Sequence, residues 1–194
     1  MKVRLVICRH TQTDDNVRRI YTGQNDVLLN EQGIKQAESL AERLSSLSQV
    51  CAIYSSDLSR TRMVTELIAR RIDVPVVFSA DLREIDVGKM AGLAKDQAER
   101  MYQDSLYRVE NPLFDFRPIS GEDWKQVLFR YHLILDRISM KHGMDPHSPN
   151  NRLPRVVVVG HGSAFRRVFI EEHHAMETLH TQGDYQECVW PSVS

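Results

Sequence analysis

The sequence predicts an α/β fold built around a largely parallel sheet, on two observations. Short runs rich in Val and Ile recur along the chain, and such runs are typical of strands that are buried on both faces. Between them lie segments whose apolar residues are spaced three to four positions apart, which is the pattern of amphipathic helices. Strand and helix patterns that alternate along one chain indicate this fold class.

Four strands are predicted from these runs, at residues 3–8, 50–54, 74–78 and 155–159. A fifth, short edge strand is expected at residues 186–190, near the end of the chain. The composition and the length of 194 residues suit a single domain over residues 1–194.

Helices are predicted between the strands. The first covers residues 30–47, with Asn30 as its N-cap, and its apolar face consists of Ile34, Ala37, Leu40, Ala41 and Leu44. The second covers residues 57–71, with Asp57 as its N-cap. A third is expected from about 122 to 141, and a fourth starts just after Gly162.

Two segments do not fit a regular core element. Residues 94–120 combine mixed charges, aromatic residues and two prolines without a clear period, which favours an inserted cap or lid. Residues 142–151 are rich in Pro and Asn and are predicted to form a surface loop.

Composition narrows the classes of partner. A formal net charge of -1 gives no general field for a polyanion, so we expect a small ligand rather than nucleic acid or an anionic membrane. Nothing in the chain has the pattern of a signal peptide or a membrane span, and a cytoplasmic location is expected. The three separated cysteines indicate neither a disulfide framework nor a zinc site.

Basic and imidazole side chains follow the predicted strands. The first strand ends in Arg9 and His10, the last ends in His161, and the second delivers Arg60 one turn into its helix. Ligands of open α/β sheets bind beyond the carboxyl ends of the strands, and two guanidiniums with two imidazoles suit a phosphate dianion. The alternative for each histidine taken singly is a structural role, in which Arg9 and His10 end a strand at the surface and His161 caps the last helix.

The chain also resembles the histidine phosphatase superfamily, which includes cofactor-dependent phosphoglycerate mutases and α-ribazole phosphatase. The similarity spans roughly residues 3–170. It lies in segments that follow one another in the family's order: CRHTQTDDN (8–16), YTGQNDVLLNEQGIKQA (21–37), SSDLSRTRMVTELI (55–68), LREIDVGKMAGL (82–93), PISGEDW (118–124) and VVGHGSAFRRV (158–168).

This resemblance implies a three-layer α/β/α sandwich and a set of roles. His10 would be the nucleophile that becomes phosphohistidine, and Glu84 the proton donor. The residues that would bind the substrate phosphate are Arg9, Asn16, Thr22, Gly23, Arg60, His161 and Gly162. The resemblance implies neither a metal nor a cofactor, and a homodimer is left open.

Three functions remain in competition. The first is a phosphatase of small phosphomonoesters, the second a cofactor-dependent phosphoglycerate mutase, and the third a non-catalytic relative that binds a phosphorylated ligand. Thr11 favours the third, because the family usually has glycine after the nucleophile, and a β-branched residue would be strained at positive φ.

Basic residues outside the motifs are interpreted more plainly. At most one of Arg18 and Arg19 is expected to face the ligand. Arg166 and Arg167 are assigned to a solvated helix face, as are the acidic and histidine residues at 171–174, for which metal binding is the less favoured alternative.

Overall fold

A five-stranded sheet forms the centre of the computed structural model, which describes residues 1–102, 107–110, 113–145, 153–171 and 182–191. The strand order is β3-β2-β6-β1-β7. The first four of these strands run parallel, and β7 pairs antiparallel with β1 at one edge. The strands are β1 (Val3–Arg9), β2 (Val50–Ser56), β3 (Val76–Ser79), β6 (Arg155–Gly160) and β7 (Tyr185–Trp190).

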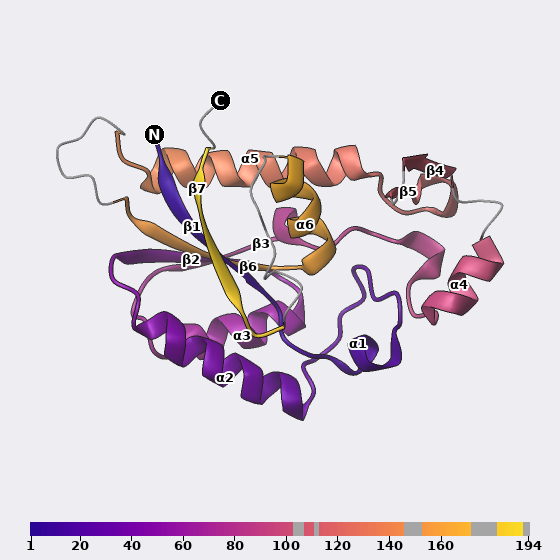
Figure 1. Ribbon diagram of the computed structural model, residues 1–194, viewed down its shortest axis with the longest axis horizontal. Helices are drawn as coiled ribbons and strands as arrows, with labels where there is room; N and C mark the ends of the chain where they lie inside the picture. Colours follow the sequence, from indigo (N-terminus) through magenta and orange to yellow (C-terminus); the bar gives the residue numbers. More distant parts are fainter. Residues whose placement is uncertain (103–106, 111–112, 146–152, 172–181, 192–194) are drawn as a thin grey trace.

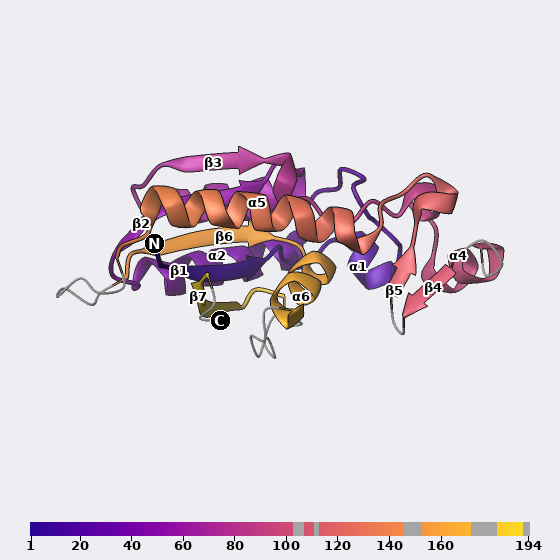
Figure 2. The same cartoon turned by 90° about the horizontal axis from the view of Figure 1, so that it is seen from above.

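Helices cover both faces of this sheet (Figures 1 and 2). On one side lie α2 (Glu31–Ser45) and α3 (Ser59–Ala69), and on the other α5 (Trp124–His142) and α6 (Gly162–Glu171). Side chains that alternate along each strand therefore enter two separate cores. In β1, for example, Leu5 and Ile7 pack on the α5 side, whereas Val6 and Cys8 pack on the α2 side. The α/β fold with a mostly parallel sheet is confirmed, and the expected edge strand is β7.

The N-termini of the helices differ from the predictions in one case. Asn30 caps α2 as expected, since its Oδ1 accepts the N–H of Gly33 at 2.9 Å. Asp57 does not cap α3: its carboxylate is engaged by Arg83 at 2.6 Å through both Nε and Nη2. Asp26 instead accepts both the backbone N–H and the hydroxyl of Ser59, the first residue of α3.

The apolar face predicted for the first helix is correct except at one position. Ala37, Leu40, Ala41 and Leu44 are buried, but Ile34 is 36% exposed. Gly33 occupies the buried place in the first turn, where a Cβ would lie 2.0 Å from the carbonyl oxygen of Gln12.

The segment predicted as a cap contains short elements of its own. They are α4 (Lys95–Tyr102), an antiparallel pair β4 (Tyr107–Glu110) and β5 (Leu113–Asp115), and a 3-10 turn at Arg117–Ile119. In Figure 1 they lie at the right-hand end of the molecule, near the short helix α1 (Asp14–Arg18). Two further 3-10 turns, Ala80–Leu82 and Gly88–Met90, lie between β3 and α4. A lid function for this segment stays a prediction.

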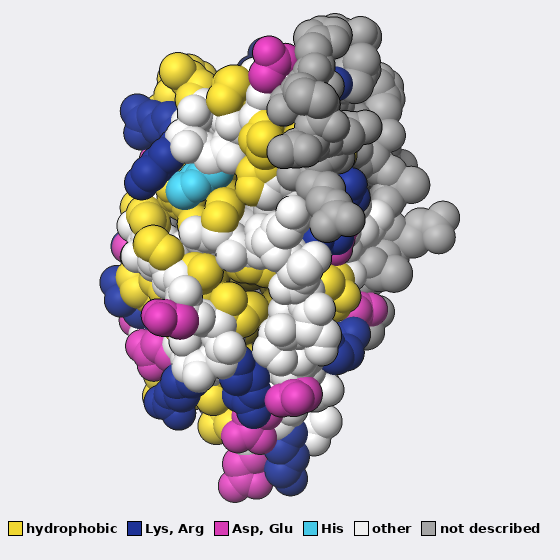
Figure 3. All heavy atoms as spheres, turned by 90° about the vertical axis from the view of Figure 1, so that its left-hand side faces the viewer, with side chains coloured by type: hydrophobic (Ala, Val, Ile, Leu, Met, Phe, Trp, Pro, Cys, Tyr) yellow, Lys and Arg dark blue, Asp and Glu magenta, His cyan; other side chains and the backbone are white. Residues whose placement is uncertain are grey.

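The opposite end of the molecule carries basic and acidic side chains mixed with apolar ones (Figure 3). Within the described ranges, no helix is long and apolar enough to cross a membrane. The three cysteines are free, with Cys8 and Cys188 buried and Cys51 half-buried. Of the loop predicted at 142–151, His142 is the last residue of α5 and residues 146–151 fall outside the described residues, as do the charged residues at 172–174.

Candidate active site

The two histidines predicted at strand ends lie side by side. β1 and β6 pair in register, with Arg9 opposite Gly160, so the next residue of each strand is a histidine. The N–H of His10 donates to the Gly160 carbonyl at 2.9 Å, and the rings of His10 and His161 are 5.4 Å apart between centroids. From the adjacent strands β1 and β6 the chain continues in opposite directions across the sheet, from β1 to β2 and from β6 to β7. The carboxyl ends of β1 and β6 therefore form a topological switch point, where open α/β sheets bind their ligands.

His10 is held as a neutral imidazole with a defined tautomer. Its Nδ1 lies 2.8 Å from the carbonyl oxygen of Thr11, which can only accept, so Nδ1 carries the ring proton. Burial lowers the pKa of His10 well below its ordinary value of 6.5, and the cations of Arg60 and Arg9 lower it further. Nε2 therefore keeps a free lone pair, as a nucleophile requires.

His161 lies behind His10 and is completely buried. Its Nε2 is 2.9 Å from the hydroxyl of Ser56, which also accepts the N–H of Leu58. Burial lowers the pKa of His161 well below 6.5, with Arg60 the next cause. Nδ1 is buried without a partner among the described residues. His161 is thus brought to the site, although it does not line the pocket itself.

Arg60 is 1% exposed and lines the pocket from the first turn of α3. Two of its N–H groups hold the neighbouring loop, Nη2 donating to the carbonyl of Gly23 at 2.8 Å and Nη1 to that of Asn25 at 2.7 Å. Burial lowers its pKa, but a guanidinium stays charged at any relevant pH. Its buried Nε has no partner within the described part of the chain, and an anionic ligand would supply one.

Arg9 lines the same pocket and packs against the start of α6. A Cβ on Gly162 would lie 2.8 Å from Arg9 Nε, so glycine makes room for the guanidinium. Gly162 does not line the pocket and acts through this space. Burial lowers the pKa of Arg9, and the nearby Glu84 opposes the change.

Glu84 reaches the site from the loop after β3, and its carboxylate accepts three backbone N–H groups. Oε1 accepts from Ile85 at 3.0 Å and from Ala164 at 2.9 Å, and Oε2 accepts from Ser163 at 3.1 Å. Ser163 and Ala164 belong to the first turn of α6, where unpaired N–H groups favour an anionic group.

Asn16, Thr22 and Gly23 also line the pocket. Asn16 Oδ1 accepts from the N–H of Thr13 at 3.1 Å and from Gln182 at 2.5 Å, so its amide nitrogen can donate to a ligand. The hydroxyl of Thr22 donates to Oδ2 of Asp15 at 2.9 Å. Gly23 has φ +52, and a Cβ there would lie 2.7 Å from Val87 Cγ2.

Thr11 fits its position without strain. It is not among the described residues with positive φ, and its buried hydroxyl donates to the Gly33 carbonyl at 2.7 Å. Since Thr11 points toward α2 and does not line the pocket, it gives no support to an inactive site.

The pocket has a volume of about 460 Å³ and an outer wall that the sequence analysis missed. Lys95, Trp124, Arg166 and Arg167 form this outer wall. Arg166 is exposed, as its assignment to a solvated face predicted, and Arg167 is half-buried, but both arginines also line the pocket, which that assignment did not predict. Both follow residues of the first turn of α6 by four positions, which is the signal that could have placed them. Arg19 lines an adjoining polar hollow together with Arg9 and Lys95.

The described residues contain no group of three or more His, Cys, Asp or Glu side chains arranged to hold a metal ion. Arginine and lysine side chains supply positive charge at the pocket.

The buried histidines predict a loss of stability on mild acidification. In the unfolded chain an imidazole takes up a proton below about pH 6.5, whereas folded His10 and His161 stay neutral. The free energy of unfolding should therefore fall by up to about 1.4 kcal/mol per histidine for each pH unit below 6.5. Urea unfolding at pH 7 and pH 5.5 measures this. The variant with His10→Asn and His161→Asn should lose this part of the slope, and an unchanged slope would contradict the assignment.

Comparison with known proteins places this site in context. The family model described as histidine phosphatase superfamily (branch 1) matches residues 5–180. A metal-independent phosphoserine phosphatase of Arabidopsis thaliana is 34% identical over 170 residues, covering 86% of this chain and 67% of the relative. A 2,3-bisphosphoglycerate-dependent phosphoglycerate mutase of Mesorhizobium japonicum is 28% identical over 173 residues, covering 86% and 79%.

Among solved structures, a mycobacterial glucosyl-3-phosphoglycerate phosphatase aligns with a TM-score of 0.76 at 24% identity, covering 97% of this chain and 91% of that one. This likeness supports the fold.

Proposed function

The chain belongs to branch 1 of the histidine phosphatase superfamily, and from this premise we propose that it hydrolyses small phosphomonoesters without a metal, through a phosphohistidine on His10. The observation that carries the proposal is the neutral His10 ring, fixed by the Thr11 carbonyl with Nε2 unprotonated, beside two arginines.

In the first step His10 Nε2 attacks phosphorus, and the bond from phosphorus to the ester oxygen breaks. Arg9 and Arg60 stabilise the charge on the phosphoryl oxygens. His161, whose Nδ1 has no partner among the described residues, supplies a further donor from that nitrogen, with Nε2 accepting from the Ser56 hydroxyl. The leaving oxygen takes its proton from Glu84, which must enter this step protonated even though the backbone N–H groups around it favour the carboxylate.

In the second step Glu84, now a carboxylate, takes a proton from water, and the oxygen of that water attacks the phosphohistidine. The bond between phosphorus and Nε2 breaks, inorganic phosphate leaves, and His10 and protonated Glu84 are restored. One carboxyl group therefore serves as acid and then as base.

Hydrolysis of p-nitrophenyl phosphate in the presence of EDTA tests this proposal. We expect turnover that EDTA does not reduce, together with acid-labile phosphate on the protein after a rapid quench. Activity that required an added divalent cation, or no labelled protein at any time, would contradict it.

The mutase is the second candidate, and the outer wall of the pocket favours it. Lys95, Arg166 and Arg167 line the pocket in addition to Arg9 and Arg60, and so offer charge for a second anionic group. The discriminating assay follows 3-phosphoglycerate with 2,3-bisphosphoglycerate as primer. Phosphate release without isomerisation supports the phosphatase, and rapid isomerisation with little release supports the mutase.

A further inference from the structure

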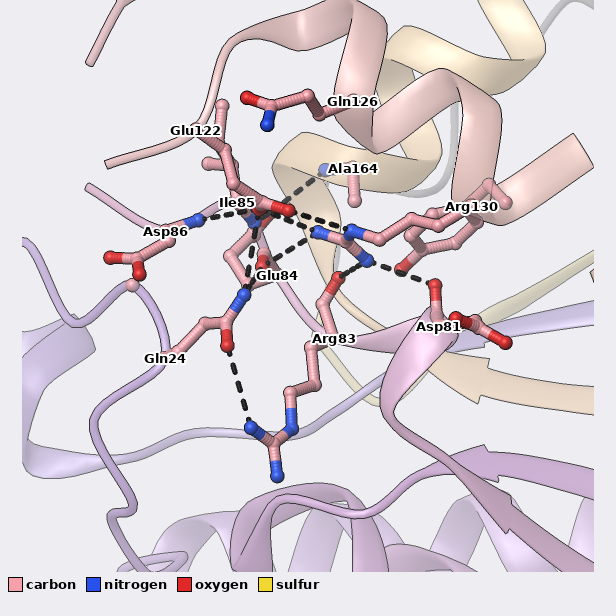
Figure 4. A network of polar contacts seen from close by, with 12 residues as sticks. Gln24, Asp81, Arg83, Glu84, Ile85, Asp86, Glu122, Gln126, Arg130 and Ala164 are labelled. Atoms are coloured by element: carbon pink, nitrogen blue, oxygen red, sulfur yellow. Dashed lines mark hydrogen bonds and ion pairs between the residues drawn. The ribbon is translucent and has the colours of Figure 1, made fainter. Parts of the chain in front are cut away.

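Arg130 on α5 reaches the loop that carries Glu84 and binds its backbone (Figure 4). Nη1 donates to the carbonyl oxygens of Asp81 at 2.9 Å and Arg83 at 2.6 Å, and Nη2 donates to that of Glu84 at 3.0 Å. Nε and Nη2 also donate to the two carboxylate oxygens of Glu122, at 3.1 and 3.0 Å. A guanidinium has five N–H groups, so each of them has an acceptor here.

Glu122 holds the other end of the same loop. Its Oε2 accepts the N–H of Asp86 at 2.9 Å, and its own N–H donates to the carbonyl of Asp86 at 2.8 Å. We call Arg130 and Glu122 the Glu84 clamp. Their side chains are 13% and 20% exposed, so the ion pair lies largely out of water.

Two neighbours extend the contact. The hydroxyl of Tyr131 donates to the Leu82 carbonyl at 2.7 Å, which leaves each backbone carbonyl from 81 to 84 with a side-chain donor. Gln24 Nε2 donates to the Glu84 carbonyl at 3.1 Å, which ties the loop to the Gly23 wall of the pocket. The backbone of Glu84 is thereby fixed to α5, while its carboxylate is bound at the start of α6.

A buried ion pair is a weak source of stability, because the desolvation of both charges offsets their attraction. The effect of the Arg130–Glu122 pair is geometric, since the pair joins the loop that carries Glu84 to α5, a helix that also packs on the sheet. We propose that Arg130 and Glu122 are positioning residues that fix the carboxyl group of Glu84 for proton transfer. This inference rests on the proposed function of Glu84 as acid and base.

The test uses Arg130→Met and measures the first step, phosphoryl transfer to His10, by single turnover. With an alkyl phosphate the leaving oxygen needs a proton, whereas p-nitrophenolate leaves without one. We expect the rate with the alkyl ester to fall about a hundredfold, as for a misplaced catalytic group. The rate with the aryl ester should fall only about tenfold, because its leaving group needs no proton. Arg137→Met, an exposed position on the same helix, is the matched control and should change neither rate.

A double-mutant cycle separates positioning from general damage. In a Glu84→Gln background, Arg130→Met should have almost no further effect on the alkyl rate, because there is no acid left to position. If Arg130→Met fails to fold, the pair Arg130→Met and Glu122→Gln removes both charges together and replaces it in the cycle.

Equal reductions of the single-turnover rates for the two esters, or additive effects of Arg130→Met and Glu84→Gln, would contradict the positioning role of Arg130 and Glu122. If the wild-type protein hydrolyses neither ester, the proposed function fails first, so the two failures are distinguishable.

Discussion

Replacing His10 by alanine is expected to reduce turnover of p-nitrophenyl phosphate by at least about a thousandfold, with no phosphate left on the protein. The reason is that no described neighbour can replace the attacking nitrogen. His161 Nε2 is directed to Ser56 and does not line the pocket. Rapid-quench labelling with a radioactive phosphomonoester, in parallel with steady-state rates, measures both effects.

The control for this variant is His142→Gln. His142 ends α5, and its Nε2 lies 2.9 Å from the hydroxyl of Tyr54; neither residue lines the pocket, so the variant loses an imidazole that is not part of it. It should keep its activity. A His10→Ala protein that turned over at the wild-type rate would eliminate the covalent mechanism.

Glu84→Gln is expected to accumulate phosphoprotein when the substrate is p-nitrophenyl phosphate. The aryl leaving group needs no proton, so His10 is still phosphorylated, but no carboxylate remains to take the proton of the attacking water. Loss of a general base of this kind slows a step by about 10²- to 10⁴-fold. With an alkyl phosphate the first step also needs the acid, so we expect slow turnover and little phosphoprotein.

The side-chain amide also changes the local bonding, because its nitrogen cannot accept from the backbone N–H groups that hold the carboxylate. Glu66→Gln, an exposed position on α3, is therefore compared in the same assay and should behave as the wild type. Phosphoprotein that failed to accumulate in Glu84→Gln while the aryl ester was hydrolysed normally would exclude the assigned role.

The sheet could be predicted because its strands are short Val-rich runs that need burial on both faces. The inner residues followed from the same reasoning, since Arg9, His10 and His161 are fixed by strand ends and by the register of β1 with β6. Glu84 was assigned through the family resemblance alone. It lies in a loop, and its position depends on backbone groups of α6 and on Arg130, which no local pattern indicates.

The outer wall could not be predicted for a related reason. Lys95 begins α4 in the cap segment and Trp124 begins α5, and both reach the pocket through tertiary packing that no local pattern indicates. For Asp57 a local pattern predicted a role that the structure does not show. Its sequence position suits a helix N-cap, but its carboxylate instead accepts two hydrogen bonds from Arg83.

Because Arg9 pairs with Gly160 in the sheet, the residues of the pocket differ in how well they should tolerate substitution. The reacting imidazole follows a central strand, so a substitution that moves it must also disturb the sheet and the fold. The outer wall comes from α4, α6 and the start of α5, outside the strands. Under the proposed function, we therefore expect replacement of Lys95 or Trp124 to change substrate preference while the position of His10 is retained, which makes those positions targets for redesigning selectivity.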